Sequence, residues 1–121
     1  MNHYVDGFLL PLAADKVDLY QQVAHKAGEV WMEHGALAYW ETVSDDLNDQ
    51  GGRSFIACAD AKENEVVVLA WVVYPSRIER DRIIAAVMAD PRLQDNINMP
   101  FDMKRMAYGG FKPIVSLSKS S

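Results

Sequence analysis

The segment EVVVLAWVVY, residues 65–74, decides the fold of this chain. Nearly every residue in it is β-branched, aromatic or aliphatic, which is the composition of a β-strand. Both alternating sets are apolar, Val66, Val68, Ala70, Val72 and Tyr74 on one side and Val67, Leu69, Trp71 and Val73 on the other. A sheet with one face in water would alternate apolar and polar residues. We therefore expect a central strand that is covered on both faces.

The residues before this segment predict a strand, a helix and a second strand. Residues 4–12 are rich in aromatic and aliphatic side chains, which favours a first strand. A helix is expected from Asp15, with Asp18 completing a rough capping box, to Gly35 as the C′ glycine. Its apolar face recurs at steps of three and four, at Val17, Tyr20, Ala24, Ala27, Trp31 and His34. Residues 36–46 favour the second strand.

The residues on the other side of the central segment predict a second helix and a fourth strand. Ser76 and Glu79 form an S-x-x-E capping box, and Asp90-Pro91 ends the helix that follows. Residues 104–117 favour the last strand. Within the stretch between the second and third strands, Ser54 is expected to cap one short helical turn.

The predicted order of strand, helix, strand, strand, helix, strand is the ferredoxin-like βαββαβ pattern of an α+β protein. Two helices then cover one face of an antiparallel sheet, with the first and third strands in the centre and the second and fourth at the edges. Pro113 is consistent with an edge strand, because proline lacks a ladder donor. We expect one domain over residues 1–121, with an insertion at 45–64 and a tail at 117–121.

The second face of this sheet leads to a prediction about assembly. Two helices cover only one face, and an open apolar face exceeds the patch that soluble monomers tolerate. A second copy packed sheet to sheet would form a homodimer, as a dimeric α/β barrel. The alternative is that the 45–64 insertion or the C-terminal tail folds over the face.

Composition and charge limit the function classes. The net charge of −5 disfavours binding to nucleic acid, and no window is long and apolar enough for a membrane span. The N-terminus lacks the features of a signal peptide, so with the single Cys58 a reducing, cytoplasmic location is expected. No metal-binding spacing or cofactor fingerprint occurs, and we expect neither a metal nor a cofactor.

Several single residues remain candidates for binding or chemistry. Asp6 interrupts an apolar strand, so it must be paired, protonated or in a wet cavity. Arg105 is its expected partner, either in a structural salt bridge or in a ligand pocket. Tyr39 or Trp40, together with Trp71, is expected to face the interior of the dimer as packing or as a ligand wall.

Two residue types with familiar chemistry are more simply explained by structure. His34 is expected to interact with the end of the first helix. Cys58 lies in the apolar stretch FIACADA and is expected to be buried and inert.

The stretch MPFDMKRMAYGGF, residues 99–111, combines the start of the fourth strand with a glycine pair. Gly109 and Gly110 predict a bulge, a bend or the close passage of another backbone. Arg105 and Tyr108 are the candidates for chemistry here.

Four segments together resemble one family: YVDGFLLP (4–11), KAGEVWMEHGAL (26–37), DPRL (90–93) and MPFDMKRMAYGGF. They are similar to the YbaA-like family of small bacterial proteins. The resemblance implies a ferredoxin-like dimeric α/β barrel and carries no activity, cofactor or catalytic residue. Three functions stay open: a homodimer that binds a small organic molecule in the barrel, a cofactor-independent monooxygenase or isomerase, and an assembly or regulatory protein with a filled barrel.

Overall fold

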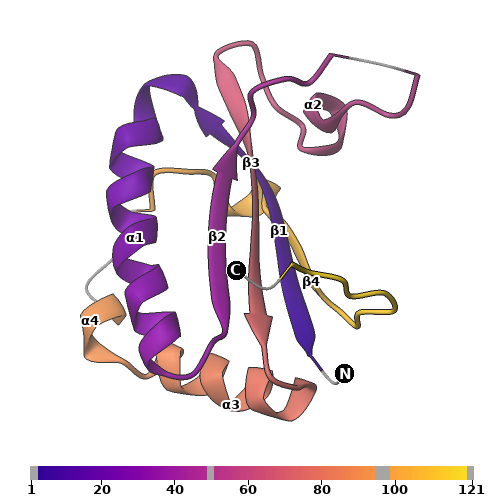
Figure 1. Cartoon of the computed structure of the whole chain (residues 1–121). Helices are drawn as coiled ribbons and strands as arrows, with labels where there is room; N and C mark the ends of the chain where they lie inside the picture. The colour runs from indigo at the N-terminus through magenta and orange to yellow at the C-terminus, as the bar shows by residue number, and fades with distance from the viewer. Residues whose placement is uncertain (1–2, 49–50, 95–98, 120–121) are drawn as a thin grey trace.

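The computed structural model describes residues 3–48, 51–94 and 99–119, and Figure 1 shows a β-sheet with helices against it. The strands are β1 (Tyr4–Ala13), β2 (Ala38–Val43), β3 (Glu65–Tyr74) and β4 (Ala107–Phe111). The helices are α1 (Val17–Glu33), α2 (Phe55–Cys58), α3 (Arg77–Met88) and α4 (Pro91–Gln94), with 3₁₀ turns at Ala14–Lys16 and Met103–Arg105.

The sheet is antiparallel, with the strand order β2-β3-β1-β4. This confirms the predicted ferredoxin-like arrangement, with the first and third strands in the centre. β1 and β3 pair over their whole length, from Tyr4 opposite Tyr74 to Ala13 opposite Glu65. Both central strands are long and apolar, and the edge strands β2 and β4 pair with them on either side.

The predicted fourth strand, residues 104–117, is too long at both ends. Lys104 and Arg105 belong to a 3₁₀ turn, in which the Asp102 side chain accepts a hydrogen bond from the Lys104 N–H. After Phe111 the chain leaves the sheet, and Pro113, which lacks an N–H, stands just beyond. Of the three alternatives predicted for the glycine pair, the bulge is wrong, since β4 pairs with β1 in unbroken register through both glycines.

The helix ends follow the sequence except at the start of α1. Ser76 accepts a hydrogen bond from the Glu79 N–H, and Ser54 from the Ile56 N–H, as expected of N-caps. Gly35 has a φ of 121°, which ends α1 in the left-handed region that favours glycine. The predicted capping box at Asp15 is wrong, because α1 begins after Lys16 and no side chain caps it.

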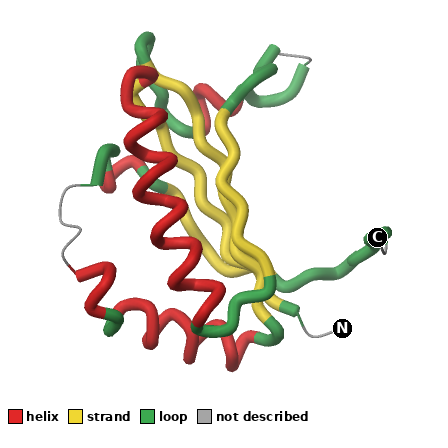
Figure 2. The backbone as a smooth tube through the Cα atoms, turned by 60° about the vertical axis from the view of Figure 1, so that its left-hand side comes forward, coloured by secondary structure: helices red, strands yellow, loops and turns green. Residues whose placement is uncertain are grey.

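The core lies between the helices and one face of the sheet, and Figure 2 shows α1 running along one side of the strands. Tyr20 and Ala24 of α1 pack in a cluster with Leu10, Leu12, Val68 and Ala70. A second cluster joins Val30 of α1 and Ile83 and Val87 of α3 to Val72 and Tyr74 of β3. Both helices therefore cover the same face, as predicted.

The other face of the sheet, which we call the open face, is apolar and largely uncovered. Trp40 is 57% exposed, Leu69 42% and Phe111 62%. The insertion covers one end only, where α2 contacts β3 and Val67 is buried. Beyond β4, Ile114 and its apolar neighbours are exposed, and Figure 2 shows this segment leaving the body on the side away from α1.

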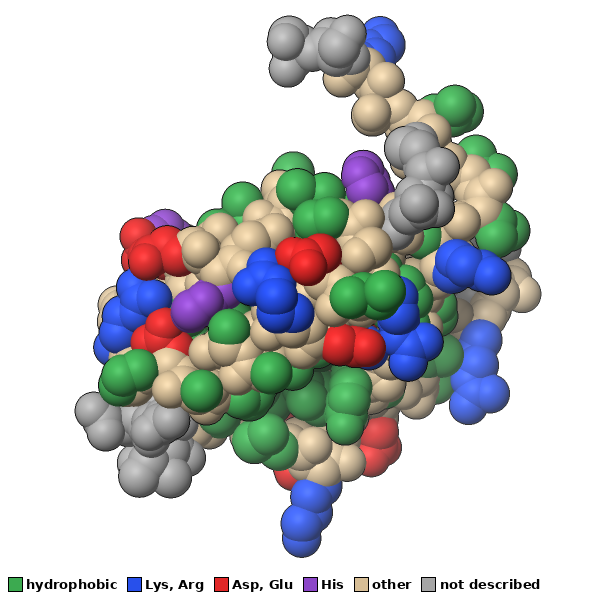
Figure 3. All heavy atoms as spheres, turned by 90° about the horizontal axis from the view of Figure 1, so that it is seen from below, with side chains coloured by type: hydrophobic (Ala, Val, Ile, Leu, Met, Phe, Trp, Pro, Cys, Tyr) green, Lys and Arg blue, Asp and Glu red, His purple; other side chains and the backbone are tan. Residues whose placement is uncertain are grey.

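The polar surface carries charges of both signs. Figure 3, seen from below, shows acidic, basic and apolar side chains interspersed. Among the described residues, no helix is both long and apolar enough to cross a membrane. No group of three or more potential metal ligands occurs in the part of the chain that the structure describes.

Candidate binding site between the first helix and the sheet

A hollow of about 150 Å³ lies between α1 and the sheet and is lined mainly by apolar side chains. Its helical wall comes from Tyr20, Val23, Ala24, Ala27 and Trp31, and its floor from β1, β2 and β3. Met99, Phe101 and Met106, on the segment before β4, close one side. A cavity of about this volume accommodates one benzene ring.

A second, wider hollow of about 420 Å³ shares part of this wall. Tyr20, Ala24, Tyr39 and Glu41 line both hollows, so the two meet at these residues. Glu41 is the acidic residue among those that the two hollows share.

Glu41 is the acidic residue of the narrow hollow, and two phenols bind its carboxylate. Tyr20 Oη donates to Oε1 at 2.7 Å, and Tyr39 Oη donates to Oε2 at 2.8 Å. Tyr39 and Glu41 alternate along β2, so both lie on the face that α1 covers. Glu41 stands opposite Ala70, whose small side chain leaves space above the sheet.

Gly28 of α1 explains how the Tyr39 ring lies so close to the helix. A Cβ atom at this position would lie 2.7 Å from the ring, closer than real Cβ contacts allow. Glycine at this helical position therefore has a packing reason, although it weakens the isolated helix.

The two phenols are held in the protonated, donating form. Burial, and then the charge of Glu41 and the hydrogen bond to it, raise the pKa of Tyr20 and of Tyr39 above the ordinary value. At neutral pH both side chains are hydrogen-bond donors to the carboxylate.

A separate buried ion pair, between Asp6 and Arg80, lies near the N-terminal end of β1. Arg80 of α3 donates to the Asp6 carboxylate from Nε at 3.1 Å and from Nη2 at 2.9 Å, and Tyr74 Oη donates to it at 2.9 Å. Trp31 Nε1 donates to Tyr74 Oη at 3.1 Å and so links this pair to the hollow. Asp6 itself is not among the residues that line either hollow.

The predicted pairing of Asp6 with Arg105 is wrong. Arg105 instead binds Glu65, with Nη2 2.7 Å from Oε2, and also binds Asp102. Arg80 lies in a stretch of α3, residues 77–82, where basic and acidic residues are interspersed, but its side chain turns inward to Asp6. Gly110 stands opposite Asp6 and makes this possible, because a Cβ there would lie 2.9 Å from Arg80 Nη2.

Of the five candidates from the sequence, Tyr39 lines the narrow hollow from the face that α1 covers. Trp71 also borders the hollow, but it stands opposite Trp40 in the sheet, so its ring lies on the open face. The Trp71 ring stacks on Trp40 with centroids 5.7 Å apart, and Trp40 is on the open face. Tyr108 is 73% exposed and stacks on Phe8. Asp6 and Arg105 lie in the ion pairs described above.

Glu41 and Tyr20 were not among the predicted site residues. The pattern that would have indicated Glu41 is the alternation Tyr39, Glu41, Val43, where a carboxylate interrupts the side of β2 that faces the helix. Tyr20 was predicted as core, and its burial bears this out, but its hydroxyl also contacts the hollow.

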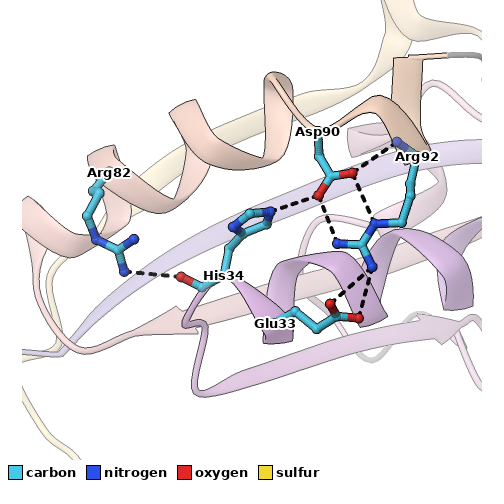
Figure 4. A network of polar contacts seen from close by, with 5 residues as sticks. All are labelled: Glu33, His34, Arg82, Asp90 and Arg92. Atoms are coloured by element: carbon cyan, nitrogen blue, oxygen red, sulfur yellow. Dashed lines mark hydrogen bonds and ion pairs between the residues drawn. The ribbon is translucent and has the colours of Figure 1, made fainter.

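His34 and Cys58 have different surroundings. Figure 4 shows the His34 ring directed at Asp90, with Nε2 and Oδ2 2.9 Å apart, and Arg92 bound to the same carboxylate and to Glu33. This network ties the end of α1 to the end of α3 and lowers the pKa of Asp90, chiefly through Arg92. Cys58 is exposed, so the predicted burial is wrong, because α2 sits at the edge of the fold.

Comparison with solved structures places the fold in the class of ferredoxin-like α+β proteins. SnoaB, a cofactor-independent oxygenase from Streptomyces nogalater, is similar over 98% of this chain and 100% of its own, with a TM-score of 0.59 and 13% identity. A dimeric ferredoxin-like protein from an uncultured marine organism covers the same shares, with a TM-score of 0.57 and 12% identity.

The sequence comparisons are more specific. Residues 3–103 match the model of a family described as protein of unknown function (DUF1428), and the chain belongs to this family. The uncharacterized protein YbaA of Escherichia coli (strain K12) is 43% identical over 113 residues, which are 93% of this chain and 97% of that protein. The predicted resemblance is thereby confirmed.

Proposed function

We propose that this protein binds a small, largely apolar organic molecule in the narrow hollow between α1 and the sheet. The observation that carries the proposal is the hollow itself, with apolar walls and one anchored carboxylate at Glu41. Ligand sites in proteins combine these two features. The sequence suggested a ligand between the sheets of a dimer, whereas this hollow lies within one chain.

The test is a titration with toluene, in which binding is monitored by the change in the NMR signal of the Trp31 indole N–H. Trp31 is part of the wall of the narrow hollow. An Ala27→Leu variant fills the narrow hollow and should abolish binding. Ala85→Leu, at an exposed alanine of α3, is the matched control and should leave binding unchanged. Equal binding by both variants would remove the hollow as the site, and no binding by the wild type would favour the filled, non-catalytic alternative.

We further propose that the open face packs against the same face of a second copy. Its exposed aromatic and aliphatic side chains form a patch that soluble monomers rarely leave in water. The dimeric ferredoxin-like protein of similar fold supports a second copy as the occupant. A two-fold interface also needs only one self-complementary surface.

Light scattering at micromolar concentration tests the assembly, since the chain mass is 13.6 kDa. A dimer should give twice this mass, and Leu69→Asp should reduce it to that of one chain. Ile78→Asp, which charges a 79% exposed position on α3, should leave the dimer intact. A wild type with the mass of one chain would refute the proposal.

The second candidate function is catalysis of a cofactor-independent oxygenation, and Glu41 is the group that favours it. The carboxylate at the hollow can accept a proton from a bound molecule, and SnoaB of similar fold is a cofactor-independent oxygenase. Asp6, the other carboxylate that interrupts an apolar strand, is held by Arg80 and Tyr74. Oxygen uptake with hydroquinone that disappears in Glu41→Gln would support turnover, and uptake no faster than in buffer would count against it.

A further inference from the structure

Glu41 differs from the other buried or half-buried acidic residues that the structure describes, because no basic side chain among the described residues forms an ion pair with it. Five acidic residues that the structure describes are buried or half-buried: Asp6, Glu41, Glu65, Glu79 and Asp90. Four of them bind an arginine, namely Arg80, Arg105, Arg82 and Arg92. Among the described Lys, Arg and His residues, none forms an ion pair with Glu41, whose partners are two neutral phenols.

The phenols leave part of the Glu41 carboxylate available. Each carboxylate oxygen can accept two hydrogen bonds, and each receives one from a tyrosine. A charge half-buried against apolar walls is stabilised by an opposite charge more than by neutral donors. The remaining acceptor positions therefore favour a ligand that donates from a positive group.

The rest of the wall also favours a cation. Tyr20 and Phe101 meet edge to face, with centroids 5.8 Å apart, and Trp31 lies 5.9 Å from Tyr39. Aromatic faces of this kind attract organic cations. No Lys or Arg is among the described residues that line either hollow, and His25, in the wider one, lies 3.7 Å from Glu29. An anionic ligand would find no countercharge in the narrow hollow.

From these observations we infer that the hollow binds a protonated amine carried on a single aromatic ring, with Glu41 binding the ammonium group. The inference rests on the proposed binding function and adds the chemical class of the ligand. The ring would occupy the narrow hollow of about 150 Å³, and the ammonium would lie where the two hollows meet. Glu41 is then a ligand-binding residue that the sequence alone did not identify.

Three probes of similar shape test the inference at pH 7: benzylammonium, benzyl alcohol and benzoate, with charges of plus one, zero and minus one. Calorimetry with the wild type should rank them in that order, with benzylammonium about tenfold tighter than benzyl alcohol. The Trp31 indole N–H signal should shift with benzylammonium. This ranking needs no variant, so it holds whether or not a substitution at Glu41 folds.

Glu41→Gln separates charge from shape. It should remove most of the tenfold preference for benzylammonium and leave benzyl alcohol within about twofold. Glu29→Gln makes the same change at an exposed acid of α1 and should keep the preference. Equal affinity for the cation and the alcohol, or tighter binding of benzoate, would overturn the inference and leave the binding function standing. If none of the three probes binds but toluene does, the inference fails and the binding function stands. If toluene does not bind either, both fail.

Discussion

The ion pair between Asp6 and Arg80 should contribute more to stability than any exposed ion pair that the structure describes. The Asp6 side chain is 6% exposed and that of Arg80 20%, and three hydrogen bonds from Arg80 reach the carboxylate. Arg80→Met keeps much of the aliphatic stem, but of the side chains that the structure describes it leaves buried Asp6 only the Tyr74 hydroxyl as a donor. Breaking a buried pair in this way costs about 3–5 kcal/mol.

Urea unfolding followed by circular dichroism at one fixed protein concentration measures this cost. The concentration must be fixed because association would add to the apparent stability. For a chain of this length, a loss of about 3 kcal/mol corresponds to a Tm lower by about 10 °C.

Arg77→Met is the matched control on the same helix. Arg77 is 65% exposed, and like Arg80 it lies over the Tyr4 ring, at 5.5 Å against 5.2 Å. Its removal should cost less than about 1 kcal/mol. A double-mutant cycle of Arg80→Met with Asp6→Asn should give a coupling of about 2 kcal/mol. A loss as small as that of Arg77→Met, or no coupling, would refute the reasoning.

Three more predictions concern Glu65, Gly28 and Asp90. Arg105 holds the pKa of Glu65 at about 2, against 4.5, so its contribution is complete above pH 4.5 and is lost as the pH falls toward 2. Glu65→Gln should therefore lower the unfolding free energy by about 3 kcal/mol at pH 6, with the difference vanishing near pH 2. Gly28→Ala should cost about 1–3 kcal/mol in urea unfolding, because its methyl group meets the Tyr39 ring. Asp90→Asn should speed amide hydrogen exchange at residues 86–94, because the α1–α3 link loses its anion.

Each of these has a control within the chain. Glu63→Gln, at an exposed acid near Glu65, should change the unfolding free energy by less than about 0.5 kcal/mol at pH 6. A constant difference for Glu65→Gln from pH 6 to pH 2 would contradict the lowered pKa of Glu65. Gly52→Ala, with open space around its Cβ, should stay within about 0.5 kcal/mol, and an equal loss at Gly28 would count against the close contact. Exchange in β1 and β3 is the internal reference for Asp90→Asn, and uniform acceleration would indicate a global effect.

The strands, the helices and their order follow from local sequence. An unbroken apolar run such as residues 65–74, a serine followed by glutamate at Ser76, and a glycine after α1 each act through neighbouring residues. The need to cover both faces of β3 also follows from its composition. These features depend on contacts between residues that are near in the chain, or on the periodicity of apolar residues. The sequence pattern is therefore enough to predict them.

The partners of the charged residues needed the tertiary structure. Asp6 and Arg80 are 74 positions apart, and nothing near either residue indicates the other. Which basic residue pairs with Asp6 depends on how α3 crosses the end of the sheet and on the space above Gly110. Arg105, predicted in a strand, is in a 3₁₀ turn and therefore reaches Glu65 instead.

The candidate site divides in the same way. The sequence singled out Tyr39 and Trp71 as candidate residues of a ligand site. It did not decide on which face of the sheet each side chain lies, because a shift of one residue in a strand exchanges its two faces. Packing of α1 against β2, with Gly28 under the Tyr39 ring, brings Tyr20 and Tyr39 to the two oxygens of Glu41. The sequence alone thus determined the main strands and helices and their order, through local and periodic preferences. Only the folded chain decided which polar groups meet, because those pairings arise from long-range packing.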